Sequence, residues 1–213
     1  MIRTGILLMA ALVVALPSIA QTSAPSSAAL PALNIPSSVG IVAKLDTDLD
    51  ASRNKPGDMV QAETTRDVKP GHDVLLKKGS VLSGHITQVQ TFSNSSASII
   101  VIVFDQAAPK GGSPATLNVK IQALAPAATV STDSLQDGRG MAATNINSAV
   151  AGENRNLGNG GELLATSVGV YGIRGMSLAS TVESQKQYSV VKSGVSDVKL
   201  KKGTQLVFKA PEQ

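Results

Sequence analysis

The sequence contains no cysteine and very few aromatic side chains: three Phe, two Tyr and no Trp. Without cysteine the fold has no disulfide and no lipid-modified N-terminal Cys, so its stability must come from packing. Nucleic-acid and carbohydrate sites commonly use aromatic faces, and the formal net charge of the 213-residue chain is only +4. The composition therefore supports neither nucleic acid nor sugar as a partner.

The N-terminal apolar run is too short to be a good membrane anchor. It extends from Gly5 to Leu16, about a dozen residues where a spanning helix needs roughly 20. Arg3 precedes it and Ser18-Ile19-Ala20 follows it, which is the layout of a cleavable secretory signal. We predict a signal peptide over residues 1–20, no transmembrane segment after its cleavage, and a periplasmic or secreted protein.

The remaining chain divides by composition into a leader and one domain. Residues 21–38 are rich in Ser, Ala and Pro without periodicity, which indicates a flexible leader. Residues 39–213 then form one β domain. Within it, residues 127–161 are rich in Gly, Asn and Ala and lack an apolar stripe, which predicts a long mobile insertion with a short helix near Asn145 to Ala151.

Short strands separated by Gly and Pro turns dominate the domain. Residues 39–46 and 116–123 alternate apolar with other residues, Val39, Ile41, Ala43 and Leu45 in the first and Leu117, Val119, Ile121 and Ala123 in the second. Residues 99–104 are apolar throughout, which predicts a central strand covered on both faces. The other expected strands are 59–68, 74–76, 81–92, 188–191, 198–200 and 205–209, while 163–173 fits a strand or a helix. This pattern predicts a mainly β fold, an antiparallel barrel or sandwich.

One motif occurs twice. LLKKGSVL at 75–82 and LKKGTQL at 200–206 share an apolar residue, Lys-Lys-Gly, a hydroxyl residue and a further apolar residue. The repeat indicates two turns in equivalent positions of two halves of a barrel, although the same motif is also a common way to build a solvated turn between strands.

The order of turn motifs resembles the C-terminal β-barrel of the TrbI-like proteins of type IV secretion and conjugation. The matching residues are Pro56-Gly57, then Gly79-Ser80 with Gly84, and Gly203-Thr204 near the end. The resemblance covers about 39–125 and the last fifteen residues, and it implies the barrel fold. Family members usually keep a cytoplasmic segment, a membrane helix and a proline-rich linker. With its cleavable signal, this chain is closer in layout to uncharacterised exported bacterial proteins that carry such a domain alone.

Asp46, Asp48 and Asp50 have the spacing of the first three ligands of a calcium loop. The rest of the calcium-loop pattern does not match, because its sixth position is Ala51 instead of Gly and its twelfth is Gly57 instead of Glu. Three solvated carboxylates at a strand end explain the pattern equally well. We predict no metal ligand here.

No other motif predicts a catalytic or cofactor site. His72 and His85 are not spaced as metal ligands, and we expect His85 to face outward. The stretch at 79–84 is not a nucleophile elbow, and Gly138-Arg139-Gly140 lacks the preceding strand of a dinucleotide site. Asn94-Ser95-Ser96 matches a glycan acceptor, which means little after a bacterial-type signal. We therefore predict no catalytic, cofactor-binding or metal-binding residue and no cofactor.

Three functions remain, in order of support. The first is a non-catalytic structural or protein-interaction module of the envelope, whose partner is another envelope protein or a second copy of the chain. The second is a small-ligand or ion-binding β-barrel. The third is an exported hydrolase, which only the compartment supports.

We expect cleavage between Ala20 and Gln21, because Ser18 and Ala20 present small side chains to the peptidase and Pro17 ends the apolar helix. Mass spectrometry of the exported protein should find Gln21 at the N-terminus. A mature N-terminus at Met1 would refute the assignment.

Overall fold

The computed structural model describes residues 30–127 and 161–212, and every regular element in these ranges is a strand. The expected signal peptide, residues 21–29 of the expected leader and residues 128–160 of the expected insertion, with its short helix, lie outside the described residues. No helix long and apolar enough to cross a membrane occurs in the described part.

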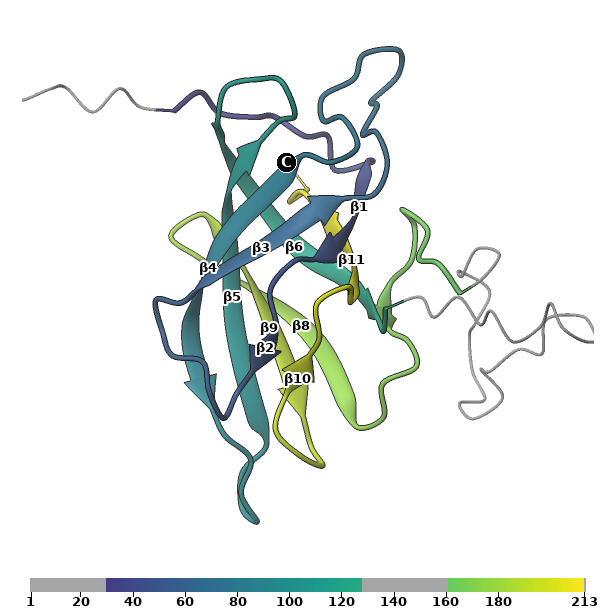
Figure 1. The fold of residues 1–213 in the computed structure, drawn as a ribbon. Coiled ribbons are helices and arrows are strands. Elements are labelled where there is room, and N and C mark those ends of the chain that lie inside the picture. Colours follow the sequence, from purple (N-terminus) through teal and green to yellow (C-terminus); the bar gives the residue numbers. More distant parts are fainter. Residues whose placement is uncertain (1–29, 128–160, 213) are drawn as a thin grey trace, which may run out of the picture.

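Six strands close an antiparallel barrel (Figure 1). In spatial order they are β1 (Gly40–Leu45), β3 (Met59–Thr64), β4 (Val81–Gln90), β5 (Ser98–Ala108), β6 (Ala115–Ala125) and β11 (Gln205–Lys209). The ring closes because β11 pairs with β1 on one side and with β6 on the other, while β6 also pairs with β5. The antiparallel barrel predicted from the sequence is confirmed.

The other strands lie outside the ring. β8 (Met176–Glu183) and β9 (Lys186–Ser193) form a hairpin attached to β5, and β7 (Gly169–Val170) pairs in parallel with β6. β2 (Leu49–Asp50) and β10 (Lys199–Leu200) form a separate two-stranded sheet. Residues 163–173, expected as one strand or helix, contain only β7 and are otherwise a loop.

The barrel interior is filled by side chains. The alternating residues Ile100, Ile102 and Phe104 of β5 point inward, and the Phe104 ring packs edge to face on Phe208 with 4.7 Å between centroids. On the outer face of β5 only Val103 is buried, while Ile99 and Val101 are half-buried. The central position of β5 is confirmed, with its outer face covered less completely than its inner face.

A register shift in β6 changes which residues face the interior. Leu117, Val119 and Ile121 contact the main core as expected. The β6–β11 pairing then shifts between Val207 and Phe208. Beyond the shift Leu124 faces the main core, whereas Ala123 packs with Val42 and Val207 in a second cluster outside it. Ala123 is therefore buried, as the alternation predicts, but on the outer face of the ring instead of the inner one.

The described part of the leader is attached to the barrel. Ala32 bridges to Thr116 of β6 in parallel, and the Leu33 N–H donates to the Thr116 carbonyl at 2.9 Å. Ile35 is buried in the main core. Residues 30–38 therefore differ from the flexible spacer expected over 21–38. The burial of Ile35 and the backbone hydrogen bonds of this segment offset the conformational entropy that it loses when it is ordered.

The first Lys-Lys-Gly turn, residues 77–80, is anchored to β3 and to the residues that follow it. The Gly79 N–H donates to the Thr64 carbonyl, and the Thr64 N–H donates to the Ser80 carbonyl, at 2.8 and 2.9 Å. The Lys78 N–H donates to Asp67 Oδ1 at 2.9 Å. Gly79 has φ of 83°, a left-handed value that favours glycine.

The second Lys-Lys-Gly turn, residues 201–204, repeats the same bonds on β1. The Gly203 N–H donates to the Leu45 carbonyl and the Leu45 N–H donates to the Thr204 carbonyl, at 2.7 and 2.8 Å. The Lys202 N–H donates to Asp48 Oδ1 at 2.7 Å, and Gly203 has φ of 89°.

These matching bonds define an approximate two-fold axis within the barrel. One half comprises β3, β4 and β5, and the other comprises β1, β11 and β6. In the β1–β3 ladder, Lys44 pairs with Glu63, and these are equivalent positions of the two halves, so the axis passes between them. The predicted equivalence of the two turns is confirmed.

Replacing Ile102 with Asp should lower the free energy of unfolding by about 3 kcal/mol or more, because an unpaired carboxylate would be buried. Ile102 is 1% exposed and lies inside the barrel. Chemical denaturation should measure the loss, with Gln106→Asp as the control, since Gln106 is exposed on the same strand. Equal unfolding of I102D and the parent would contradict the packing described here.

Candidate functional site

Asp46 and Asp48, two of the three aspartates with the spacing of calcium ligands, form ion pairs with lysines. Lys202 Nζ lies 2.7 Å from Asp46 Oδ1, and Lys201 Nζ lies 3.2 Å from Asp48 Oδ2. Asp48 also accepts the Lys202 N–H described above. Asp48 therefore anchors the second Lys-Lys-Gly turn, as Asp67 anchors the first.

Hydrogen bonds and nearby cations lower the pKa values of these carboxyl groups. The largest cause is the Lys202 side chain for Asp46, the Lys202 N–H for Asp48, and the Ser52 hydroxyl for Asp50. Because each folded-state pKa lies below the unfolded value, ionisation favours the folded state at neutral pH, and this contribution is lost as pH falls through the folded-state values. Asp48 and the lysines paired with these groups are exposed, while Asp46 and Asp50 are half-buried, so solvent screening leaves the pairs only a weak stabilising effect.

No group of three or more His, Cys, Asp or Glu side chains that could hold a metal ion occurs in residues 30–127 and 161–212. In the acidic cluster, the oxygens that calcium would need are already bonded to lysine ammonium groups and N–H donors. The arrangement supports the turn and leaves little capacity for a cation.

The two histidines are both on the surface. His72 is exposed in its turn, and His85 faces outward from β4 as expected. His85 Nδ1 lies 3.8 Å from Asp105 Oδ2. Among the described residues no serine or threonine hydroxyl bonds to His85, so the pair lacks the nucleophile of a hydrolytic triad.

Ser80 of the GSVLSG stretch is buried and has a structural role. Its hydroxyl donates to the Lys77 carbonyl at 2.7 Å and accepts the Lys110 N–H at 3.0 Å. Gly84 lies where β4 and β5 approach each other closely, since a Cβ there would overlap the Val103 carbonyl oxygen. These motif residues therefore build turns and strand contacts.

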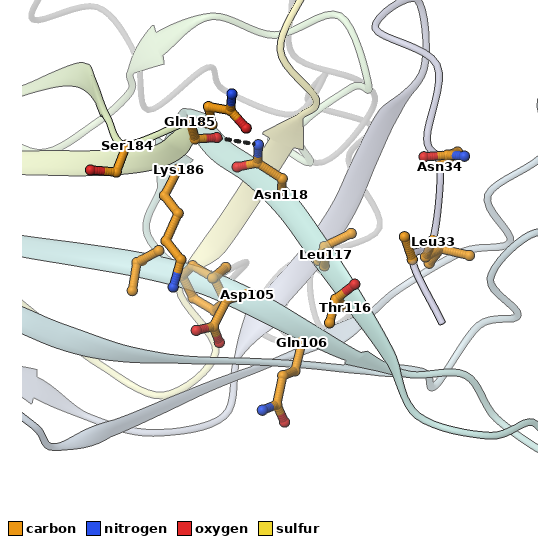
Figure 2. A pocket seen from close by; sticks show the side chains of 13 residues that line it. Leu33, Asn34, Asp105, Gln106, Thr116, Leu117, Asn118, Ser184, Gln185 and Lys186 are labelled. Carbon is orange, nitrogen blue, oxygen red and sulfur yellow. Dashed lines mark hydrogen bonds between the residues drawn. The ribbon is translucent and has the colours of Figure 1, made fainter. Parts of the chain in front are cut away.

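An open groove of about 440 Å³ lies where β5 changes partner (Figure 2). β5 pairs with β9 as far as Val103 and with β6 from Phe104 onward. The groove is bounded by this branch point, by the leader at Leu33 and Asn34, and by the β8–β9 turn. Figure 2 shows Lys186 extending from that turn toward the side of the groove where Asp105 lies.

Asn118 fastens the β8–β9 turn to the barrel beside this groove. Its amide donates to the Gln185 carbonyl at 2.8 Å (Figure 2). Its Oδ1 accepts the Gln187 N–H at 3.0 Å. Further along, the Ile121 N–H donates to the Ser189 hydroxyl at 2.8 Å. Side chains thus replace the backbone ladder between β6 and β9, and they hold the hairpin in a fixed position.

The hairpin presents β8 as the outer edge of the sheet. β8 pairs with β9 through eight successive residue pairs without a register shift, and it ends the strand order on that side. The Gly194 N–H donates to the Gly175 carbonyl at 2.9 Å, so this pair is hydrogen-bonded. Because antiparallel pairs alternate, the backbone groups of Met176, Leu178, Ser180 and Val182 face away from β9, toward the open edge.

Within residues 30–127 and 161–212 no strand pairs with this edge, and β8 itself lacks the sequence features that usually protect edge strands. Proteins block exposed edges with proline, lysine, bulges or short strands. β8 has none of these, and its only charge is the terminal Glu183. The strand at the opposite end, β7, is two residues long. Sequence reasoning did not identify β8, because its small and polar residues are mostly exposed and show no clear apolar alternation.

The described chain thus belongs to the class of closed, side-chain-filled antiparallel barrels with an external hairpin. No protein-family model and no curated protein match the sequence. Among solved structures it is similar to ComB10 of the Com type IV secretion system of Helicobacter pylori, with 16% identity, a TM-score of 0.38, and coverage of 80% of this chain and 84% of that chain.

Millimolar calcium should not raise the melting temperature by more than about one degree, because a ligand stabilises only a site that it can occupy. Thermal unfolding with calcium should be compared with sodium chloride at equal ionic strength, which screens the exposed ion pairs equally. A rise of several degrees that is lost in Asp48→Asn would show that the cluster binds calcium after all.

Proposed function

We propose that this protein is a non-catalytic structural or interaction module of the cell envelope, periplasmic or secreted, that holds a partner along β8. The partner is another envelope protein or a second copy of the chain. The carrying observation is the edge of β8, which no other described strand pairs with and whose outward backbone groups can extend the sheet by one strand. The signal-like N-terminus supports export.

The rigidity of the hairpin also supports this function. Asn118 and Ser189 fix it to β6, and Met176 and Leu178 pack partly against the main core. An edge held in this way is ordered before a partner arrives, so less entropy is lost on binding.

The alternative of a small-ligand barrel has less support. The side chains that fill the interior, among them Phe104, Phe208 and Leu124, occupy the space that a barrel ligand would need. The external groove at the branch point is open to solvent, and charged side chains such as Asp105 and Lys186 lie among its apolar lining residues, whereas ligand pockets usually enclose most of their ligand.

The hydrolase alternative also has little support. Ser80 is committed to two structural hydrogen bonds, and the His85–Asp105 pair has no bonded hydroxyl among the described residues. A nucleophile and base normally lie within hydrogen-bond reach of one another.

We expect cross-linking in cells, followed by affinity purification of the exported protein, to recover a defined partner that depends on β8. Ser180→Pro removes the N–H that faces the open edge, whereas Ser180→Ala keeps it and is the matched control. Recovery should be lost with proline and kept with alanine. Equal recovery of every partner with both variants would contradict the role of this edge.

A further inference from the structure

We infer that β8 pairs with β8 of a second copy, antiparallel about a two-fold axis at Ser180, so that two sheets join edge to edge. This inference rests on the proposed function and specifies its partner. It depends on three properties of β8: the direction of its backbone groups, the match of its sequence with itself, and the apolar side chains on its inner face.

The backbone restricts the register. Only the even-numbered residues of β8 direct their N–H and C=O groups toward the open edge, as the Gly175–Gly194 hydrogen bond establishes. A hydrogen-bonded antiparallel pairing with a second copy must therefore join even residues to even residues. An axis at Ser180 meets this requirement, because Ser180 then exchanges both backbone bonds with the partner's Ser180.

The side chains fit this register. Leu178 lies opposite the partner's Val182, and the two-fold axis repeats the contact, which gives two apolar cross-strand pairs. Ser177 lies opposite the partner's Glu183, so the only charge of the strand faces a neutral residue. An axis one residue earlier, at Ala179, would instead place Leu178 opposite the partner's polar Ser180.

The inner face of β8 gains cover from the second copy. Met176, Leu178 and Val182 share this face with Val191 of β9, which is fully buried. Met176 and Leu178 contact the core, but Val182 near the far end of β8 is 60% exposed. In the dimer the partner's Leu178 lies beside it and removes part of its surface from water.

A second copy is favoured over an unrelated strand because β8 by itself meets both the backbone register and the side-chain match described above. Isologous two-fold contacts need a self-complementary surface, and β8 offers apolar against apolar, serine against serine, and no like charges opposite each other. β8 pairs with β9 without a bulge, so its outward backbone groups alternate regularly over the whole strand.

The first test measures association of the exported, purified protein by sedimentation over a range of concentrations. The parent and Ser180→Ala should form dimers. Ser180→Pro should weaken the dimer at least about tenfold, because two symmetry-related hydrogen bonds are lost. Thermal unfolding checks that S180P is folded, as expected because the Ser180 N–H does not bond to β9. A parent that stays monomeric at every concentration, or an S180P dimer as strong as the parent, would overturn the inference.

The second test uses the absence of cysteine in this chain. In the proposed register Ser180→Cys places two cysteines opposite each other, with Cα atoms about 5.5 Å apart, within reach of a disulfide. The control Ser177→Cys is also on an exposed residue, but its two copies lie roughly 20 Å apart along the strands. Mild oxidation should cross-link S180C much faster than S177C, and equal rates would mean random collision and overturn the register.

The outcomes separate this inference from the proposed function. A monomeric parent whose capture of another envelope protein is abolished by Ser180→Pro overturns the self-pairing and keeps the interaction edge. A monomeric parent whose captured proteins are unaffected by S180P overturns both.

Discussion

The architecture depends on one constraint: β5 has two edges, and one of them is shared between two partners. β4 occupies the first edge along its whole length, while β9 takes the early part of the second edge and β6 takes the later part. The β6 pairing closes the barrel. The β9 pairing carries the hairpin outside it, and the groove lies where the two partners diverge. The open edge of β8 is thus a direct result of how β5 distributes its hydrogen bonds.

The sequence predicts those features that depend on local patterns. The apolar run of β5, the alternation of β1 and the Gly-containing turns each have a strong local signal, and each was placed correctly. The duplicated Lys-Lys-Gly motif even identified the two equivalent turns. What remained hidden depends on tertiary pairing. β8 has no apolar alternation, Ile35 lies in a segment with the composition of a linker, and the shift in β6 follows from its fit to β11.

The acidic cluster illustrates how one sequence pattern can serve another purpose. Aspartates at alternate positions match the beginning of a calcium loop. In the fold, however, Asp46 and Asp48 pair with Lys202 and Lys201, which lie about 150 residues later in the sequence. Sequence spacing alone does not show such long-range pairing. Asp67 has the same role as Asp48 on the other half of the barrel, and only the structure reveals the correspondence.

The two halves related by the axis between Lys44 and Glu63 differ in how the chain runs through them. Each half contributes three strands, one Lys-Lys-Gly turn and one anchoring aspartate, and the ring closes only when both halves are present. The two halves are interleaved along the chain, since β3, β4 and β5 all lie between β1 and β6, and β11 follows both. The ring therefore stays open during synthesis until β11 has emerged, because β11 joins β1 to β6.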